Sequence, residues 1–218
     1  RGRSLLLACV SRSSQEYLRP LYATGELRGL QSVRAFKALT SDMVGLCAPG
    51  DGLTARQIDA ICDLIYELFR NTDEHATLDV DGNLKPEPRF RALSVSYREM
   101  PVANSGDYFG NELSIQSYIS RIVARSKKIQ KIKVLEISVI DNGPGLAARW
   151  LAGNASELVS SSASISEELQ AVKQCFEKYN TTKLDSGAGQ GLTKVVTQLA
   201  LLNAFLRLRT GRLALYQS

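Results

Sequence analysis

The sequence predicts a fold that combines α-helices with β-strands. Phe90–Met100 and Val134–Asp141 alternate apolar and polar residues, as strands with one buried face do. Leu30–Leu46 and the segment that begins at Thr54 instead repeat apolar residues every three or four positions, which is typical of a helix with one buried face. With 218 residues, the chain can form one sizeable hydrophobic core.

The composition is ordinary for a globular domain, with 44% hydrophobic and 22% charged residues. A formal charge of +5 is compatible with polyanionic ligands such as nucleotides, but it does not establish nucleic-acid binding. The four cysteines form no CxxC pair, so neither a zinc site nor a disulfide framework is indicated, and we expect reduced thiols in a cytoplasmic protein. No apolar run reaches the roughly 18 residues of a membrane-spanning helix. Since the first residue is Arg1, we expect the chain to be a piece of a longer protein.

The first 52 residues predict one strand and two helices. Ser4–Val10 has the composition of a buried strand, and we expect a short helix around Gln15–Tyr22. Leu30–Leu46 follows as an amphipathic helix. Ala48–Gly52, which contains proline and glycine, ends this part of the chain.

The helix that begins at Thr54 carries the first candidate functional residues. Thr54 is a suitable N-cap. The apolar stripe of this helix consists of Ile58, Ile61, Ile65 and Leu68. Beside the stripe, Glu67, Asn71 and His75 follow one another at spacings of four, which places them on one face of the helix. This face is either an ordinary solvated polar face or one wall of a ligand site.

An insertion separates the two predicted strands in the middle of the chain. Val80–Pro88 is polar and rich in turn residues, and the insertion itself covers about residues 101–131. It contains an expected helix at Glu112–Ser126, whose end overlaps the basic segment Arg125–Lys133. This segment is either a nucleic-acid patch or a solvated helix end. Because Tyr118 is the only aromatic residue nearby, the solvated helix end is favoured.

The strand Val134–Asp141 ends in the turn Asn142–Gly145. Its alternation places Asp141 in phase with the apolar residues, on the face that we expect to be buried. A carboxylate in such a position needs a hydrogen-bond donor. Either a bound ligand supplies this donor, or the aspartate simply caps the turn.

A glycine-rich string precedes the last predicted helix. Residues 147–186 hold the serine run Ser160–Ser164 and an expected helix at Ser166–Tyr179. Gly187–Gly191 then leads into an apolar helix at Leu192–Phe205, and two short strands follow it. Glycines before a helix expose N–H groups at the positive end of its dipole, where phosphate binds, although a flexible hinge is the alternative. The string does not follow a strand and lacks a Lys-Ser/Thr ending, so neither a dinucleotide-binding turn nor a P-loop is indicated.

Three motifs therefore occur in order: ELFRNTDEH in a helix, DNGPG after a strand, and TTK…GAGQGL before a helix. This ordered set resembles the GHKL (Bergerat-fold) ATPase superfamily, the histidine-kinase-like ATPase domain of DNA gyrase, the heat-shock chaperone, mismatch-repair proteins and sensor histidine kinases. The resemblance spans about Thr54–Tyr216. It implies an α/β (α+β) two-layer sandwich with a mixed, mainly antiparallel sheet, helices on one face, and ATP held under a lid at about residues 147–186. Residues 1–52 would be an extension packed on the ATPase domain at 53–218.

By this resemblance, the motifs bind ATP and Mg²⁺. Asp141 would accept a hydrogen bond from the adenine amino group, and Gly143 and Gly145 would let the backbone approach the base. Asn71 would bind Mg²⁺ through its side-chain oxygen. Glu67, one turn earlier, would be the general base that polarises the attacking water.

The remaining residues of the motifs complete the expected nucleotide site. Those that would close over the phosphates at the end of a mobile lid are Thr182, Lys183, Gly187, Gly189, Gly191 and Leu192. Glu74 and His75 would lie near the nucleotide, with a hydrogen-bonding rather than a catalytic role for His75. Two features depart from the family. The chain ends before the late Gly-Thr strand, and His75 is its single histidine, so autophosphorylation on histidine is not expected.

The favoured function is Mg²⁺-dependent ATP binding and hydrolysis, which would drive conformational or dimerisation switching in a larger protein. Two alternatives stay open: a protein (serine/histidine) kinase that acts on a partner protein, and a non-hydrolysing nucleotide-responsive interaction module. The expected partners are ATP and other domains of the same protein or a partner protein, with a homodimer as a further candidate. Nucleic-acid binding stays open, and no membrane is expected.

Overall fold

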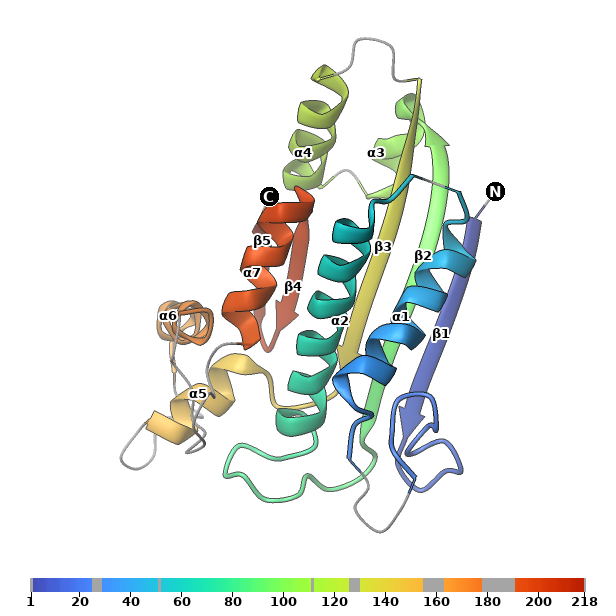
Figure 1. Ribbon diagram of the computed structural model, residues 1–218. Helices are drawn as coiled ribbons and strands as arrows, with labels where there is room; N and C mark the ends of the chain where they lie inside the picture. The colour runs from blue at the N-terminus through green and yellow to red at the C-terminus, as the bar shows by residue number, and fades with distance from the viewer. Residues whose placement is uncertain are drawn as a thin grey trace.

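The computed structural model describes residues 2–24, 29–50, 52–110, 112–125, 130–154, 163–177 and 191–217 (Figure 1). Within these residues, a three-stranded antiparallel sheet in the order β1-β2-β3 forms the centre of the fold. Its strands are β1 (Gly2–Val10), β2 (Phe90–Pro101) and β3 (Lys131–Asp141). The hairpin of β4 (Leu206–Thr210) and β5 (Leu213–Gln217) forms a second sheet.

One face of the central sheet is apolar because its three strands alternate in register. Leu7 of β1 pairs with Leu93 of β2, which in turn pairs with Val139 of β3. These residues pack against helices α1 (Val33–Cys47) and α2 (Ala55–His75), which cover this face of the sheet in Figure 1. The fold is therefore α/β with antiparallel sheets, and a layer of helices lies on one face of the central sheet.

Helix α2 is the central helix of this layer. It begins with a capping box, in which the Thr54 hydroxyl accepts a hydrogen bond from the Gln57 N–H (3.3 Å) and the Gln57 side chain accepts one from the Thr54 N–H (2.9 Å). The predicted N-cap at Thr54 is thus confirmed. Phe69 of α2 is completely buried, and helix α7 (Gly191–Leu202) packs alongside α2.

A second apolar cluster forms where α5 (Leu146–Asn154) and α6 (Ile165–Cys175) pack against the β4–β5 hairpin. Its buried residues are Ala147, Ala171, Val172 and Leu213. The Trp150 indole N–H donates a hydrogen bond to Gln174 Oε1 at 2.9 Å, which joins the two helices. Both helices belong to the segment predicted as a lid. Residues 155–162 and 178–186 of that segment lie outside the described residues.

The insertion between β2 and β3 contains a 3₁₀ turn (Val102–Asn104) and two helices, α3 (Ser105–Tyr108) and α4 (Leu113–Ala124). Helix α4 confirms the helix predicted at this place. A third apolar cluster holds the insertion against the ends of β2 and β3, and its buried residues are Met100, Ile119 and Ile132. Of the basic segment predicted here, residues 126–129 lie outside the described residues.

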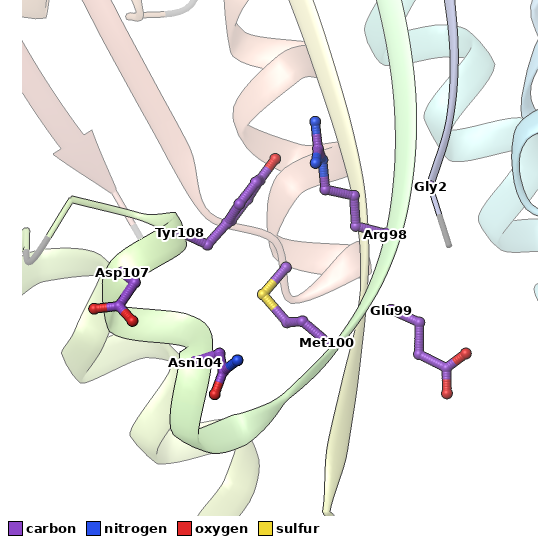
Figure 2. Close-up of a pocket in the computed structure, with 7 residues that line it drawn as sticks. All are labelled: Gly2, Arg98, Glu99, Met100, Asn104, Asp107 and Tyr108. Atoms are coloured by element: carbon purple, nitrogen blue, oxygen red, sulfur yellow. The ribbon is translucent and has the colours of Figure 1, made fainter.

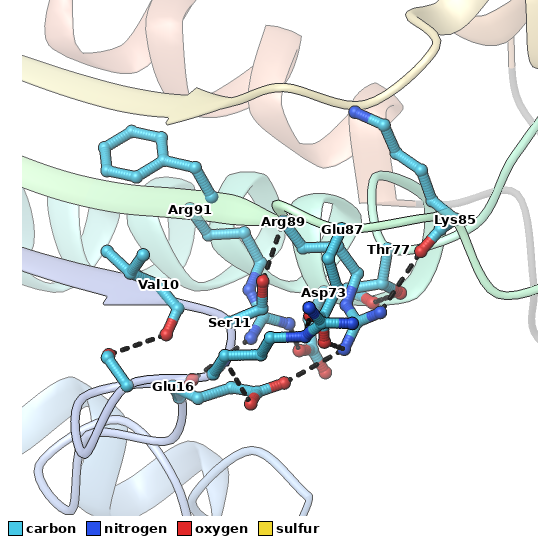
Figure 3. A network of polar contacts seen from close by, with 12 residues as sticks. Val10, Ser11, Glu16, Asp73, Thr77, Lys85, Glu87, Arg89 and Arg91 are labelled. Carbon is cyan, nitrogen blue, oxygen red and sulfur yellow. Dashed lines mark hydrogen bonds and ion pairs between the residues drawn. The ribbon is translucent and has the colours of Figure 1, made fainter.

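Two predictions about the elements are wrong. Residues 15–22 form turns rather than a helix, because side-chain contacts to the rest of the fold determine their course. Glu16 accepts a hydrogen bond from Arg89 Nη2 at 3.1 Å, within the polar network of Figure 3, and the Tyr22 hydroxyl donates one to Asp73 at 2.7 Å. The sheet was expected to be mixed and mainly antiparallel. Its antiparallel character is confirmed, but the expected parallel pairing is wrong for the described residues, where every strand pairing is antiparallel. Helix α5 was not predicted at all.

The N-terminal segment is part of the central sheet and of the main core. Strand β1 pairs with β2 along its whole length, and α1 packs against α2. The described residues of this segment, 2–24 and 29–50, therefore share one core with the rest of the fold. None of the helices in the described ranges has the length and apolar character that crossing a membrane requires.

Candidate functional site

Glu67 is enclosed between α2 and α7. Its side chain is only 8% exposed, and Oε1 lies 2.9 Å from the Lys194 ammonium on α7. The Arg70 guanidinium lies 4.0 Å from Oε2. A buried carboxylate needs such cationic partners, because burial without them strongly disfavours its charged form. The interpretation of this helix face as an ordinary solvated face is therefore wrong for Glu67.

Gly191, the first residue of α7, lies directly against Glu67 and Asn71. A Cβ atom at position 191 would be 3.0 Å from Glu67 Oε2 and 3.8 Å from Asn71 Oδ1. The Asn71 Nδ2 atom is buried and has no hydrogen-bond partner in the part of the chain that the structure describes. The first turn of a helix presents N–H groups without intrahelical partners and a positive dipole end. A carboxylate, a side-chain amide and a helix N-terminus therefore meet at one place.

Glu74 and His75 occupy the last turn of α2. Glu74 Oε1 accepts a hydrogen bond from Arg70 Nε at 2.8 Å, one turn earlier on the same helix. Burial lowers the pKa of His75, and the charges of Arg149 and Arg70 lower it further. The imidazole is therefore neutral at pH 7 and suited to hydrogen bonding rather than to carrying charge.

Asp141 is the last residue of β3 and pairs with Arg91 of β2. Its Oδ1 accepts a hydrogen bond from the Gly143 N–H at 2.8 Å. The prediction that Asp141 is buried is wrong: the residue is exposed, because it follows Val139 beyond the last apolar row of the sheet. Surrounding atoms nevertheless remove solvation from its carboxyl group and raise its pKa, while the hydrogen bond from Gly143 and the charge of Lys85 oppose this rise.

The two glycines after Asp141 allow close approach between parts of the protein itself. A Cβ atom on Gly143 would lie 2.5 Å from Ala76 Cα, at the end of α2. Gly145 has a positive φ of 88°, and a Cβ atom there would lie 2.9 Å from Thr210 Oγ1 at the end of β4. The Thr210 hydroxyl also accepts a hydrogen bond from the Leu146 N–H at 2.8 Å. Packing thus accounts for both glycines, and their expected contact with a nucleotide base stays a prediction.

Of the third motif, TTK…GAGQGL, the structure describes only the last two residues, Gly191 and Leu192. Leu192 is partly buried in the first turn of α7, next to Gly191. Four other predicted residues of this motif lie outside the described part of the chain: Thr182, Lys183, Gly187 and Gly189.

A metal at this site would have few protein ligands. The described residues contain no group of three or more His, Cys, Asp and Glu side chains that could hold a metal ion. The Asn71 side-chain oxygen would then be the main protein ligand. This suits Mg²⁺, which usually keeps several waters and shares phosphate oxygens with its protein site.

Three cations near the predicted residues were missed by sequence reasoning. Lys194 pairs with Glu67, Lys85 donates a hydrogen bond to the carbonyl oxygen of Asn142, and Arg149 Nη1 donates to the carbonyl oxygen of Asp79 at 2.8 Å. Lys85 and Arg149 belong to no motif. Lys194 could have been found, because a side chain in the first turn of a helix points back toward the start of that helix.

A cavity of about 420 Å³ lies elsewhere on the central sheet. Figure 2 shows Arg98, Met100 and Tyr108 among the residues that line it. Asp141 pairs with Arg91, and Arg98 lies seven residues further along β2. At the rise of a strand, the two places are roughly 24 Å apart. This cavity is therefore separate from the cluster around α2.

Comparison of the chain with protein-family models, with curated proteins and with solved structures gives no match. No family is therefore assigned, and the resemblance of the three motifs to the GHKL ATPases stays a hypothesis.

Proposed function

We propose that this chain is a Mg²⁺-dependent ATP-binding domain of the GHKL (Bergerat-fold) type that hydrolyses ATP as part of a switch in a larger protein. The observation that supports this most is the convergence of the three motifs along α2. Gly191 of the third motif abuts Glu67 and Asn71 of the first, and Gly143 of the second abuts Ala76 at the end of the same helix. These segments are far apart in the sequence, and the fold brings a residue of each motif to one helix.

The donor and acceptor groups of the cluster suit the parts of ATP that the resemblance assigns to them. A carboxylate can accept several hydrogen bonds, so Asp141 can accept one from the adenine amino group in addition to the one from Gly143. The amide of Asn71, whose nitrogen lacks a partner among the described residues, would offer its oxygen to Mg²⁺ and its N–H₂ group to a phosphate oxygen. The N-terminus of α7 would supply further N–H donors to phosphate.

Glu67 is the candidate general base for hydrolysis. Its carboxylate would accept a proton from a water molecule as the water oxygen bonds to the terminal phosphorus and ADP departs with the electrons of the broken P–O bond. One observation favours a second candidate function, the non-hydrolysing module. Oε1 of Glu67 is engaged by Lys194, which leaves fewer lone pairs of the carboxylate free to accept a proton from water.

The proposal is tested by the thermal stability of the protein with and without Mg²⁺–ATP. A ligand that binds only the folded state stabilises it by about 2.7 kcal/mol when present at 100 times its Kd, so the Tm should rise. Asp141→Asn should remove most of this rise, because an amide offers the adenine amino group a weaker acceptor. Asp107→Asn, which changes an exposed aspartate beside the separate cavity, should retain it.

Release of inorganic phosphate then separates the two candidate functions, since only the ATPase produces it. The absence of any Tm rise for the wild-type protein at millimolar Mg²⁺–ATP would overturn the proposed function.

A further inference from the structure

Lys194 lies at a place where two kinds of anion compete for it. Its ammonium is 2.9 Å from Glu67 Oε1, yet its side chain is 56% exposed, whereas that of Glu67 is 8% exposed. Lys194 also belongs to the first turn of α7, which begins at Gly191 beside Asn71. The ammonium therefore lies next to the helix N-terminus that the proposed function assigns to the ATP phosphates.

The ion pair restricts what Glu67 can do. Lys194 engages Oε1 of the carboxylate, whereas Oε2 is the oxygen that faces Gly191. A carboxylate that holds an ammonium has fewer lone pairs free to accept a proton from water. Arg70 is a weaker partner, because it lies 4.0 Å from Oε2 and its Nε binds Glu74. The long and exposed Lys194 side chain can turn toward another anion without exposing apolar surface.

We propose that Lys194 is a phosphate-binding residue that exchanges its partner Glu67 for the terminal phosphate of a nucleoside triphosphate, an inference that rests on the proposed function. A phosphate group carries more negative charge than a carboxylate and has three strong acceptor oxygens, so it competes well for an accessible ammonium. The exchange joins two events. Lys194 neutralises charge on the phosphate, and Glu67 Oε1 becomes free to accept a proton from water. A nucleotide that lacks the terminal phosphate leaves the pair intact.

A simpler role for Lys194 is to stay beside Glu67 and shield its charge. Both roles predict that Lys194→Met weakens ATP binding, since the uncovered Glu67 carboxylate would repel the phosphates. The effect of Lys194→Met in a Glu67→Gln background separates the two roles, because glutamine carries no charge to shield. In that background, a phosphate-binding lysine still contributes to affinity and a shielding lysine does not.

The experiment measures Kd for Mg²⁺–ATP, Mg²⁺–ADP and adenosine by calorimetry, with the wild-type protein, the two single variants and the double variant. Glu67→Gln should bind ATP more tightly than the wild type, because Lys194 no longer has to leave a carboxylate. Adding Lys194→Met to Glu67→Gln should weaken ATP binding by about tenfold or more, the value of one charge-assisted hydrogen bond. It should weaken ADP binding less and leave adenosine binding unchanged. Lys194→Arg should retain most of the ATP affinity.

The matched control is Lys131→Met, which removes the exposed lysine paired with Glu99 at 3.4 Å and should leave all three affinities unchanged. The Tm of each variant without nucleotide verifies that it is folded. Equal ATP affinity of Glu67→Gln with and without Lys194→Met, in a protein whose wild type binds ATP, would overturn this inference and leave the proposed function standing. A wild type that binds neither ATP nor adenosine would overturn both.

Discussion

Replacing Gly143 with alanine should destabilise the protein, because the turn after β3 and the end of α2 touch at this residue. The added Cβ atom would lie 2.5 Å from Ala76 Cα and 2.6 Å from Ala76 Cβ. Non-bonded carbon atoms prefer separations of about 3.5–4.0 Å, so the turn or the helix end has to move by about 1 Å. Neither Ala76 atom can rotate away, since one belongs to the backbone and the other is bonded directly to it. Overpacking of this kind costs about 1–3 kcal/mol of unfolding free energy.

The free energy of unfolding is measured by urea denaturation at pH 7, with Gly45→Ala as the matched control. Gly45 lies in the last turn of α1, is exposed, and has no atom within 4 Å of the position that a Cβ would take. Alanine should therefore stabilise the helix there by about 0.5–1 kcal/mol. Replacing glycine with alanine should thus lower the free energy of unfolding at position 143 and raise it at position 45. A Gly143→Ala protein as stable as the wild type would refute the close approach on which the convergence of the motifs depends.

Three further changes test the structure. Thr54→Ala removes one half of the capping box of α2 and should lower the free energy of unfolding, measured by urea denaturation, by about 1 kcal/mol. An unchanged free energy of unfolding would mean that the capping box does not form in solution. Arg91→Met leaves Asp73 without its guanidinium partner at 2.5 Å, although the Tyr22 hydroxyl still donates to this carboxylate. The loss should cost about 2 kcal/mol in the same assay, and a cost below that of Thr54→Ala would count against this partly buried pair. Burial lowers the pKa of His75, so the imidazole takes up a proton in the unfolded chain before it does so in the folded protein as the pH falls. The stability that neutral His75 contributes is therefore complete above its ordinary pKa of 6.5. It is lost as the pH falls toward the lowered pKa. His75→Gln should therefore lose less Tm than the wild type between about pH 7 and pH 5, and equal losses would show that His75 does not sense this change.

The main strands and helices could be predicted because their patterns are local. The alternation of Leu93 and Val95 requires a strand wherever one face is buried, and the capping residues at Thr54 mark a helix start in any context. The prediction of a helix at residues 15–22 was wrong because their course depends on contacts with Arg89 and Asp73, which lie far away in the sequence. Helix α5 was not predicted because it begins directly after a glycine turn. It buries its apolar residues against a hairpin whose position local sequence patterns do not indicate.

The candidate site was predictable in its residues but not in its environment. A spacing of four places Glu67 and Asn71 on one helix face whether that face meets water or protein, and it is the arrival of α7 that buries Glu67. The alternation of β3 likewise determines which face Asp141 belongs to, but not where the apolar rows of the sheet end. The place of Lys194 in the first turn of its helix was readable from the sequence, but its pairing with Glu67 was not, since that partner comes from another helix.

Packing between α2 and α7 would hold the shape of the candidate site during the exchange that we propose for Lys194. Phe69 of α2 and Val195 of α7 are both completely buried in the main core, so the two helices cannot shift relative to each other without opening apolar contacts. That packing sets the distance from the start of α7 to Glu67 and Asn71, and the polar groups themselves do not have to maintain it. The exposed end of Lys194 contributes little to this packing. In the proposed exchange, its ammonium would therefore leave Glu67 for a phosphate while the backbone donors of α7 and the carboxylate of α2 stay in place.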